Sequence, residues 1–151
     1  MKYKLRLDLK LELKFVTFYR IERISNGEIG GWIESEENLS QYGNSWVFGN
    51  AQVSGNAQVY GNAQVYGDAQ VFGDARVSSI KEILNFIVPF KFPITITPDN
   101  VAIGCKLKTR KEWLKMTKKQ AKEMGLEEKY YSKYKALLKA GFAMIPERKK
   151  K

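Results

Sequence analysis

Side chains able to carry out acid–base or nucleophilic chemistry are scarce in this sequence. It contains no histidine, the side chain that most often transfers protons near neutral pH. Its one cysteine, Cys105, precedes Lys106, which could favour a reactive thiolate, although a buried or incidental cysteine is the simpler interpretation. Asp68 and Asp74 occupy repeat positions that hold asparagine elsewhere, so we interpret both as turn residues. With no phosphate-binding glycine loop or dinucleotide fingerprint either, we predict no catalytic residues, no metal site and no cofactor.

A second group of residues has chemistry suited to binding. A tyrosine ring can stack on a nucleobase, and arginine or lysine can neutralise a phosphate. The candidates are Tyr60 and Arg76, which the repeat spacing places on one side, and Lys106, Lys108 and Arg110 at the start of a basic tail. We predict that these five residues bind an anionic nucleotide. The alternative is that Tyr60 packs under the tail and that Arg76 is an ordinary surface residue.

The element that must position these residues is a six-residue repeat. The stretch GNAQVSGNAQVYGNAQVYGDAQVFGDARV occupies residues 49–77, and a degenerate copy, GNSWVF, begins at Gly43. Within one repeat, Ala and Val point to one side and the intervening residues to the other, as in a short strand. Gly-Asn forms the corner because both residues tolerate positive φ. Three repeats, about 18 residues, therefore close one coil of a triangular prism with Ala and Val inside.

The outer sides of such a prism carry the residues that are three repeats apart. One side is expected to expose Trp46 and Phe48 beside Tyr66, and Phe72 lies on a neighbouring side. We predict these four residues as an interface for a homo-oligomer or a host protein, because exposed aromatic patches often bind proteins. The alternative is that the N-terminal strands or C-terminal helices of the same chain cover them.

The flanks of the repeat predict both strands and helices. Apolar residues at every odd position of 3–15 indicate a strand, and 16–24 is a second strand candidate, so the two form either one bent strand or a hairpin. Ile33 and Leu39, six residues apart, fit an imperfect first coil. Downstream, 79–88 has the spacing of a short apolar helix that would plug the open end of the prism.

The last third of the chain holds all of the excess positive charge. Residues 94–105 predict a further pair of strands. Residues 106–151 contain 16 Lys and Arg and 5 Glu, whereas the whole chain has a net charge of +10. Two S/T-x-x-E/Q patterns predict helix starts at Thr109 and Thr117, and the final ERKKK is expected to be frayed. We divide the chain into residues 1–105, strands and coils, and residues 106–151, a basic helical region.

The tandem GNAxVxGxAxV hexads resemble those of hexapeptide-repeat proteins. The flanking segments YRIERI, GEIGGWIESEENLSQYGNSWVFGNAQV and ITITPDNVAIGC resemble small proteins encoded by phages and prophages. The resemblance implies a mainly β fold built on a left-handed parallel β-helix, trimeric association and a phage-related origin, but no particular activity. Hexapeptide-repeat acyltransferases use a histidine base, and a related branch binds zinc through histidines, so the absence of histidine excludes both chemistries here.

These observations predict a non-enzymatic, oligomeric binding protein of phage type. Our leading hypothesis is a counter-defence sponge that sequesters an anionic nucleotide signal of bacterial immunity. The alternatives are a structural or adaptor protein that binds another protein through its apolar side, and a nucleic-acid-binding inhibitor. We expect the protein in the cytoplasm, away from membranes, because it has one cysteine, no uninterrupted apolar segment and no secretion signal.

Overall fold

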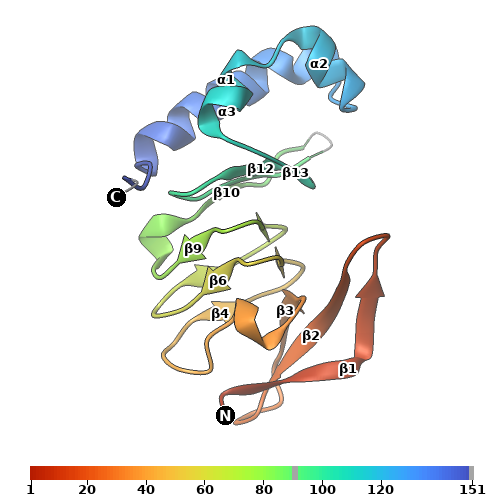
Figure 1. Ribbon diagram of the computed structural model, residues 1–151, viewed down its shortest axis with the longest axis vertical. Coiled ribbons are helices and arrows are strands. Elements are labelled where there is room, and N and C mark those ends of the chain that lie inside the picture. Colours follow the sequence, from red (N-terminus) through yellow and green to blue (C-terminus); the bar gives the residue numbers. More distant parts are fainter. Residues whose placement is uncertain (90–91, 150–151) are drawn as a thin grey trace.

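The chain is organised as a stack of coils between an N-terminal hairpin and a C-terminal cap (Figure 1). The structure, a computed structural model, describes residues 1–89 and 92–149. Along the long axis of the molecule, the hairpin and first coil lie at one end and the helices at the other. The mainly β character and the helical C-terminal region predicted from the sequence are confirmed.

The coil stack consists of short strands that pair in parallel with the strand 18 residues further along. Gln52 pairs with Gln70, Trp46 with Gln64 and Gln58 with Arg76, so the predicted 18-residue coil is confirmed. Backbone bonds follow the same spacing between layers, for example Gln58 N to Ala75 O at 2.9 Å. The strands on the three sides are, in turn, β3 (Ile29–Ile33), β5 (Gln52–Val53) and β8 (Gln70–Val71); β4 (Trp46–Val47) and β7 (Gln64–Val65); and β6 (Gln58–Val59) and β9 (Arg76–Val77).

The interior and the corners of the stack follow directly from the residue types of the repeat. The repeat alanines and valines from Val47 to Val77 are fully buried in one core. The corner glycines from Gly43 to Gly73 all have φ between 57° and 72°, the left-handed region that glycine occupies without strain. At Gly61 a Cβ atom would also stand 2.6 Å from the Ser78 carbonyl oxygen of the next layer. The close spacing of the layers and the positive φ of the corner therefore both require glycine at this position.

The imperfect first coil predicted around Ile33 and Leu39 is confirmed. Ile33 pairs with Val53, and Leu39 forms a bridge with Val59. Between them lies the 3-10 helix η1 (Glu36–Asn38). The buried Asn38 amide donates to the carbonyls of Gly55 at 3.0 Å and Ala57 at 2.9 Å, and so replaces a backbone layer that is missing at this lower rim.

The N-terminal residues form a hairpin rather than one bent strand. Strand β1 (Tyr3–Glu12) pairs antiparallel with β2 (Thr17–Arg23), and β2 pairs antiparallel with β3 of the first coil. The register slips between Arg6 and Lys10, where three residues of β1 have no partner in β2. β1 is the outermost strand of the sheet β1-β2-β3-β5-β8, and the hairpin projects sideways from the stack (Figure 1).

The predicted helix over 79–88 is wrong. The 3-10 helix η2 covers only Ile80–Glu82, and β10 (Leu84–Phe86) follows at once. β10 pairs antiparallel with β11 (Ile94–Ile96), β11 with β12 (Val101–Ile103), and β12 with β13 (Lys106–Lys108). The strand pair predicted in 94–105 is confirmed, and its free edge recruits residues 84–86 as a third strand in preference to an isolated single-turn helix.

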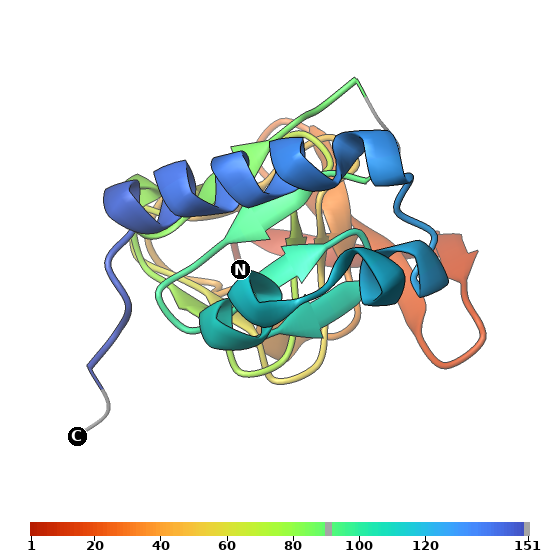
Figure 2. The same cartoon turned by 90° about the horizontal axis from the view of Figure 1, so that it is seen from above.

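Helices cover the outer face of this second sheet (Figure 2). α1 (Arg110–Lys115) and α2 (Lys118–Glu123) begin with the predicted capping boxes at Thr109 and Thr117. The 3-10 helix η3 (Glu128–Tyr130) leads into α3 (Tyr131–Met144). No helix within 1–89 and 92–149 is long and apolar enough to cross a membrane.

The cap has a hydrophobic core of its own, separate from that of the stack. The predicted boundary at residue 105 divides this core, because strand residues before that position pack with the helices after it. Its fully buried large side chains are Ile94, Ile96, Trp113, Tyr134 and Leu138.

Candidate functional site

A polar cleft that contains Arg76, one of the residues of the predicted anion site, lies where the last coil meets the cap. A cleft of about 810 Å³ is lined by Arg76 from β9, by Pro98, Asp99 and Asn100 from the turn between β11 and β12, and by Arg148 near the C-terminus, among others. An adjoining hollow of about 570 Å³ shares Arg76, Asp99 and Arg148 and extends over β6. Together these hollows form one polar groove along the β6–β9 side.

Part of the charge in this polar groove, that of Asp99 and Arg148, is already paired within the chain. Arg148 Nε donates to Asp99 Oδ1 at 2.8 Å, and Arg148 Nη2 donates to the Arg76 carbonyl at 2.9 Å. Asp99 Oδ2 accepts from the Arg76 backbone N–H at 2.8 Å, and Glu82 lies 3.5 Å from Arg148. The bond to Asp99 raises the pKa of Arg148. The expected frayed tail is therefore wrong at Arg148, which fastens residues 146–149 to the last coil.

The structure brings together only part of the predicted anion site. Tyr60, 38% exposed, lies on the Arg76 side, because its N–H donates to the Val77 carbonyl. Lys106 and Lys108 contribute to other hollows. Arg110 is half-buried, with its guanidinium 4.8 Å from the Phe142 ring centroid and bonded to a backbone carbonyl of the cap, and burial lowers its pKa. Of the five predicted residues, only Arg76 therefore lines the polar groove, and Tyr60 lies on the same side of the stack.

Sequence reasoning missed Asp99 and Arg148 as members of this groove. Asp99 lies in a turn, and Arg148 lies in a run of charges with no periodic pattern. Each meets the repeat only through tertiary contacts, since Arg148 is 72 residues from Arg76. The one general expectation that could have pointed to them is that the last coil leaves backbone N–H and C=O groups unpaired, so other residues must bond to them.

The hollow that holds Lys108 lies between β13, α1 and α2 and has a volume of about 460 Å³. Its charged lining is balanced, with Lys108 and Lys115 facing Glu112 and Glu123. Cys105 is exposed, and no group of three or more Cys, Asp or Glu that could hold a metal is found within 1–89 and 92–149. This hollow therefore does not concentrate one sign of charge.

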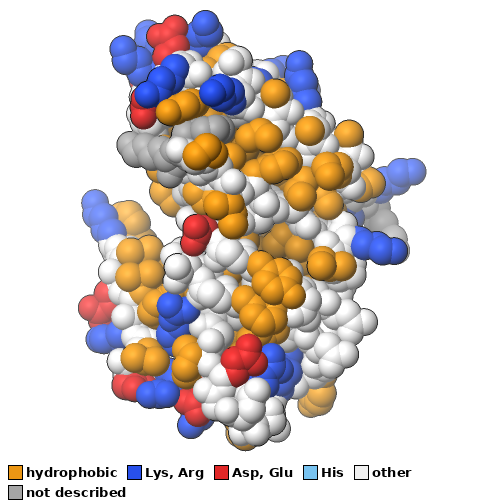
Figure 3. All heavy atoms as spheres, turned by 180° about the vertical axis from the view of Figure 1, so that it is seen from behind, with side chains coloured by type: hydrophobic (Ala, Val, Ile, Leu, Met, Phe, Trp, Pro, Cys, Tyr) orange, Lys and Arg blue, Asp and Glu red, His pale blue; other side chains and the backbone are white. Residues whose placement is uncertain are grey.

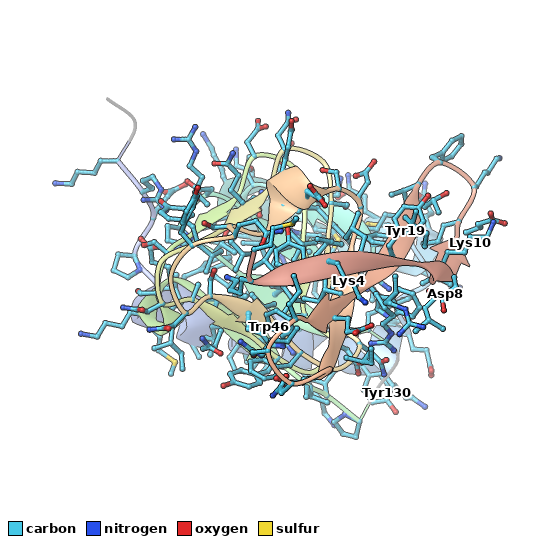
Figure 4. The ribbon with its side chains drawn as sticks, turned by 90° about the horizontal axis from the view of Figure 1, so that it is seen from below. Lys4, Asp8, Lys10, Tyr19, Trp46 and Tyr130 are labelled. Atoms are coloured by element: carbon cyan, nitrogen blue, oxygen red, sulfur yellow. The ribbon has the colours of Figure 1, made fainter. Side chains whose placement is uncertain are left out.

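Trp46, predicted to be exposed, is instead fully buried beneath the N-terminal hairpin. The Arg23 guanidinium lies 3.9 Å from its ring centroid, and the Tyr3 ring meets it edge-on at 6.3 Å. Lys2 also reaches over this region and donates to the Ser45 carbonyl at 2.8 Å. Figure 4 labels Trp46 within the body of the molecule, beneath β1 and β2. The alternative of cover by the same chain is therefore correct for this residue.

Phe48 and Tyr66 remain on the surface of the β4–β7 side. Their rings stack with centroids 4.5 Å apart and planes within 9°, and Tyr66 is 51% exposed. Beside them runs a groove of about 200 Å³ whose large apolar lining residues are Tyr66, Ile80, Ile83 and Ile87. Ile80 and Ile87 are 61% and 69% exposed. We call these four residues, together with Phe48, the apolar groove.

This apolar groove is part of a wider band of hydrophobic side chains that runs from the coil stack toward the cap on the face seen in Figure 3. Phe72 does not belong to the groove. It follows β8 on a neighbouring side, where its carbonyl accepts a bond from the Asn100 amide at 3.0 Å. Ile80, Ile83, Leu84 and Ile87 were expected to form one helical face that plugs the stack. With η2 and β10 in place of that helix, Ile83 packs against the stack core and Leu84 packs against the cap core.

Comparisons with family models, with curated proteins and with solved structures find no match for this chain.

Proposed function

We propose that this protein is a non-catalytic adaptor that binds another protein through the apolar groove. The observation that carries the proposal is the exposure of Ile80 and Ile87 beside the Phe48–Tyr66 stack. Large apolar side chains at this density on a folded surface are typical of protein contacts. The volume of about 200 Å³ is below the roughly 300–1,000 Å³ of small-molecule pockets, and it suits one anchoring side chain of a partner.

The geometry supports the adaptor over a nucleotide sponge because of how charge is distributed. The polar groove contains Asp74, Asp99 and Glu147 as well as Arg76, Arg148 and Lys149. A phosphate entering it would lie close to these carboxylates and would compete with Asp99 for Arg148. Among the described residues that line it, the apolar groove has no charged side chain, and this neutral lining matches an apolar side chain.

We also propose that the coil stack is a left-handed parallel β-helix. The support is the 18-residue parallel pairing, the corner glycines at positive φ and the interior of alanine and valine. Such a frame is rigid because each layer is bonded to the next, and a rigid surface loses little conformational entropy when a partner binds.

The adaptor is tested by a photocross-linking residue placed at position 87, followed by purification of the cross-linked partner and titration calorimetry. Tyr66→Ala should weaken binding at least tenfold, and Ile87→Glu should abolish it, because a buried charge without a partner is unfavourable. Tyr42→Ala and Leu114→Glu are matched controls, since both residues are exposed and lie outside the groove. A purified partner that binds both groove variants as tightly as the wild type would contradict the proposal.

The second candidate is sequestration of an anionic nucleotide in the polar groove, the counter-defence role. It is favoured by one observation: within the part of the chain that the structure describes, the Arg76 guanidinium makes no ion pair, and Tyr60 lies on the same side. Calorimetry against cyclic di- and trinucleotides and ADP-ribose-type signals tests it. Binding below roughly 10 μM that Arg76→Ala weakens tenfold would support this role, and no binding across the panel would remove it.

A further inference from the structure

The outer surface of the cap carries a surplus of positive charge. Residues 110–144, which include α1, α2, η3 and α3, contain ten Lys and Arg and only four Glu. Eight of the nine lysines in this range are exposed, and the ninth, Lys135, is half-buried. Figure 3 shows Lys and Arg side chains gathered over this end of the molecule. A surface of this kind attracts anions.

Few of these lysines have a carboxylate partner within the chain. Lys118 Nζ lies 3.9 Å from a carboxylate oxygen of Glu128, and Lys129 Nζ lies 3.0 Å from one of Glu127. These two pairs are exposed and therefore contribute little to stability. The other six exposed lysines of residues 110–144 make no ion pair within 1–89 and 92–149. Their charge is therefore available to an external partner.

The clearest part of this surface is α3, which contains three lysines and no acidic residue. Its buried Tyr134 and Leu138 define the side that packs against the cap core. With about 3.6 residues per turn, the opposite side of the helix centres on Ala136 and is flanked by Lys133 and Lys139. Both of these lysines are exposed. We call Lys133 and Lys139 the lysine face.

The positive charges beside the lysine face are held close to one another. The Nζ atoms of Lys129 and Lys133 lie 4.8 Å and 5.5 Å from the centroid of the same Tyr130 ring. Burial, with a further contribution from the Lys139 charge, lowers the pKa of Lys135. Like charges this close repel each other, and an anion placed over them lowers their electrostatic energy. The lysine face therefore favours a ligand that carries several negative charges.

The neighbouring side chains favour a phosphate backbone over unpaired bases or a lipid surface. Proteins bind single-stranded nucleic acids largely by stacking bases on aromatic rings. Trp113 and Tyr134, however, are buried, and the rings of Tyr130 and Tyr131 already have lysines over them. Interfacial helices bind lipid through an apolar face, whereas the apolar side of α3 is buried in the cap core. Duplex DNA presents about one negative charge per 1.7 Å of its axis and needs neither feature.

We propose that the outer surface of the cap, centred on the lysine face, binds the phosphate backbone of double-stranded DNA without reading its sequence. The exposed side chains between the two lysines are serine and alanine, which do not extend beyond the lysines toward base edges. Contacts to phosphates position a protein on DNA but carry no sequence information. α3 lies across the end of the molecule that is remote from the N-terminus, as Figure 1 and Figure 2 show, so a duplex can approach it. This binding does not depend on the proposed function of the apolar groove.

The test is the fluorescence anisotropy of a labelled duplex of about 20 base pairs, titrated with the full-length chain at several salt concentrations. The wild type should bind with a Kd of about 1–100 μM at roughly 0.1 M salt, the range of sequence-independent DNA binding. Lys133→Gln combined with Lys139→Gln should weaken binding by about tenfold or more, and should make the slope of log K against log salt shallower by about 2, because two phosphate contacts are lost. Lys133→Arg combined with Lys139→Arg should bind as the wild type does, because the charge is kept.

The matched control is Lys4→Gln combined with Lys10→Gln, because it removes the same charge from lysines that pair with Glu22 and Glu12. Its affinity for the duplex should stay within about twofold of the wild type, since salt screens charges this far from the cap. Tyr66→Ala should also bind DNA normally, which separates this proposal from the adaptor. Circular dichroism shows that each variant remains folded. A wild type that does not bind the duplex, equal losses in the control and the lysine-face variant, or tighter binding to a single strand or to anionic phospholipid vesicles would overturn the proposal.

Discussion

The β9 side and the β7 side of the coil stack end in repeats of the same type, Gly73–Ser78 and Gly61–Tyr66, but are closed in opposite ways. On the β9 side, Asp99 accepts the Arg76 N–H and is bonded in turn by Arg148, so the chain provides its own polar partners. On the β7 side, residues 80–87 cross the rim with exposed isoleucines and leave the apolar groove open. Polar groups that already bond within the chain leave few contacts for a ligand. Apolar side chains exposed to solvent favour binding of a partner that buries them.

The largest effect is expected where the β7 side is covered. Trp46→Ala should lower the free energy of unfolding by about 3–5 kcal/mol, because it removes a fully buried aromatic side chain and the seat of the hairpin. Tyr66→Ala, on the exposed part of the same side, should cost under about 1 kcal/mol. Urea unfolding of both variants checks the contrast, and equal losses would mean that Tyr66 has a structural role.

Trp46→Phe sharpens this comparison further. The Trp46 Nε1 atom has no hydrogen-bond partner among the described residues, so losing it should cost little. We expect a loss well below that of Trp46→Ala, in the range of about 1–2 kcal/mol typical of modest reductions in core volume.

A second, smaller effect is expected at the lower rim, which is closed by a side chain in the same way as the β9 side. Asn38→Ala should cost about 1–3 kcal/mol, because it leaves the buried carbonyl of Ala57 and the partly buried carbonyl of Gly55 without their donor. Asn56→Ala is the matched control, since Asn56 is exposed and bonds only Asp74 in the next layer. A control that destabilises as much as Asn38→Ala would show that burial is not the cause.

The polar closure of the β9 side is expected to contribute less. Arg148→Ala should cost about 1 kcal/mol or less, because its ion pairs with Asp99 and Glu82 are partly exposed. Raising the salt concentration should reduce the difference between variant and wild type. Faster amide exchange at residues 146–149 in the variant, measured by mass spectrometry, would report the release of the tail; unchanged exchange there would mean that Arg148 does not fasten it.

The last expected effect is a pH dependence at the hairpin that covers Trp46. Burial, with a further contribution from the nearby Arg23 charge, lowers the pKa of Lys2 from 10.5 to about 8. Between those two values the unfolded chain binds more protons than the folded chain, so stability should rise with pH across that window. Lys2→Met should remove the rise, and Arg23→Gln should reduce it, in unfolding curves recorded from about pH 7.5 to 10. A rise that persists in Lys2→Met would assign it to another group.

The sequence predicted the repeat far better than its ends. A six-residue period with glycine corners and small interior residues fixes the length of the coil but not its handedness, because every layer imposes the same spacing on the next. Residues 79–88 have helical spacing yet form η2 and β10. A helix of this length is not stable by itself, so pairing with the free edge of β11 outweighed the local helical preference of residues 84–86. Trp46 similarly occupies a repeat position whose side chain points outward from the stack, but the N-terminal hairpin of the same chain covers it.

By itself, the sequence determined the coil period, the corners, the buried alanines and valines, the N-terminal strand and the helix starts of the cap, all of which depend on neighbours within a few residues. Only the tertiary structure decided which outer residues stay open. Arg76 meets Arg148, and Trp46 meets Arg23, across separations of 72 and 23 residues. The composition of a repeat specifies which side chains point outward, but whether another segment covers them depends on where distant segments pack.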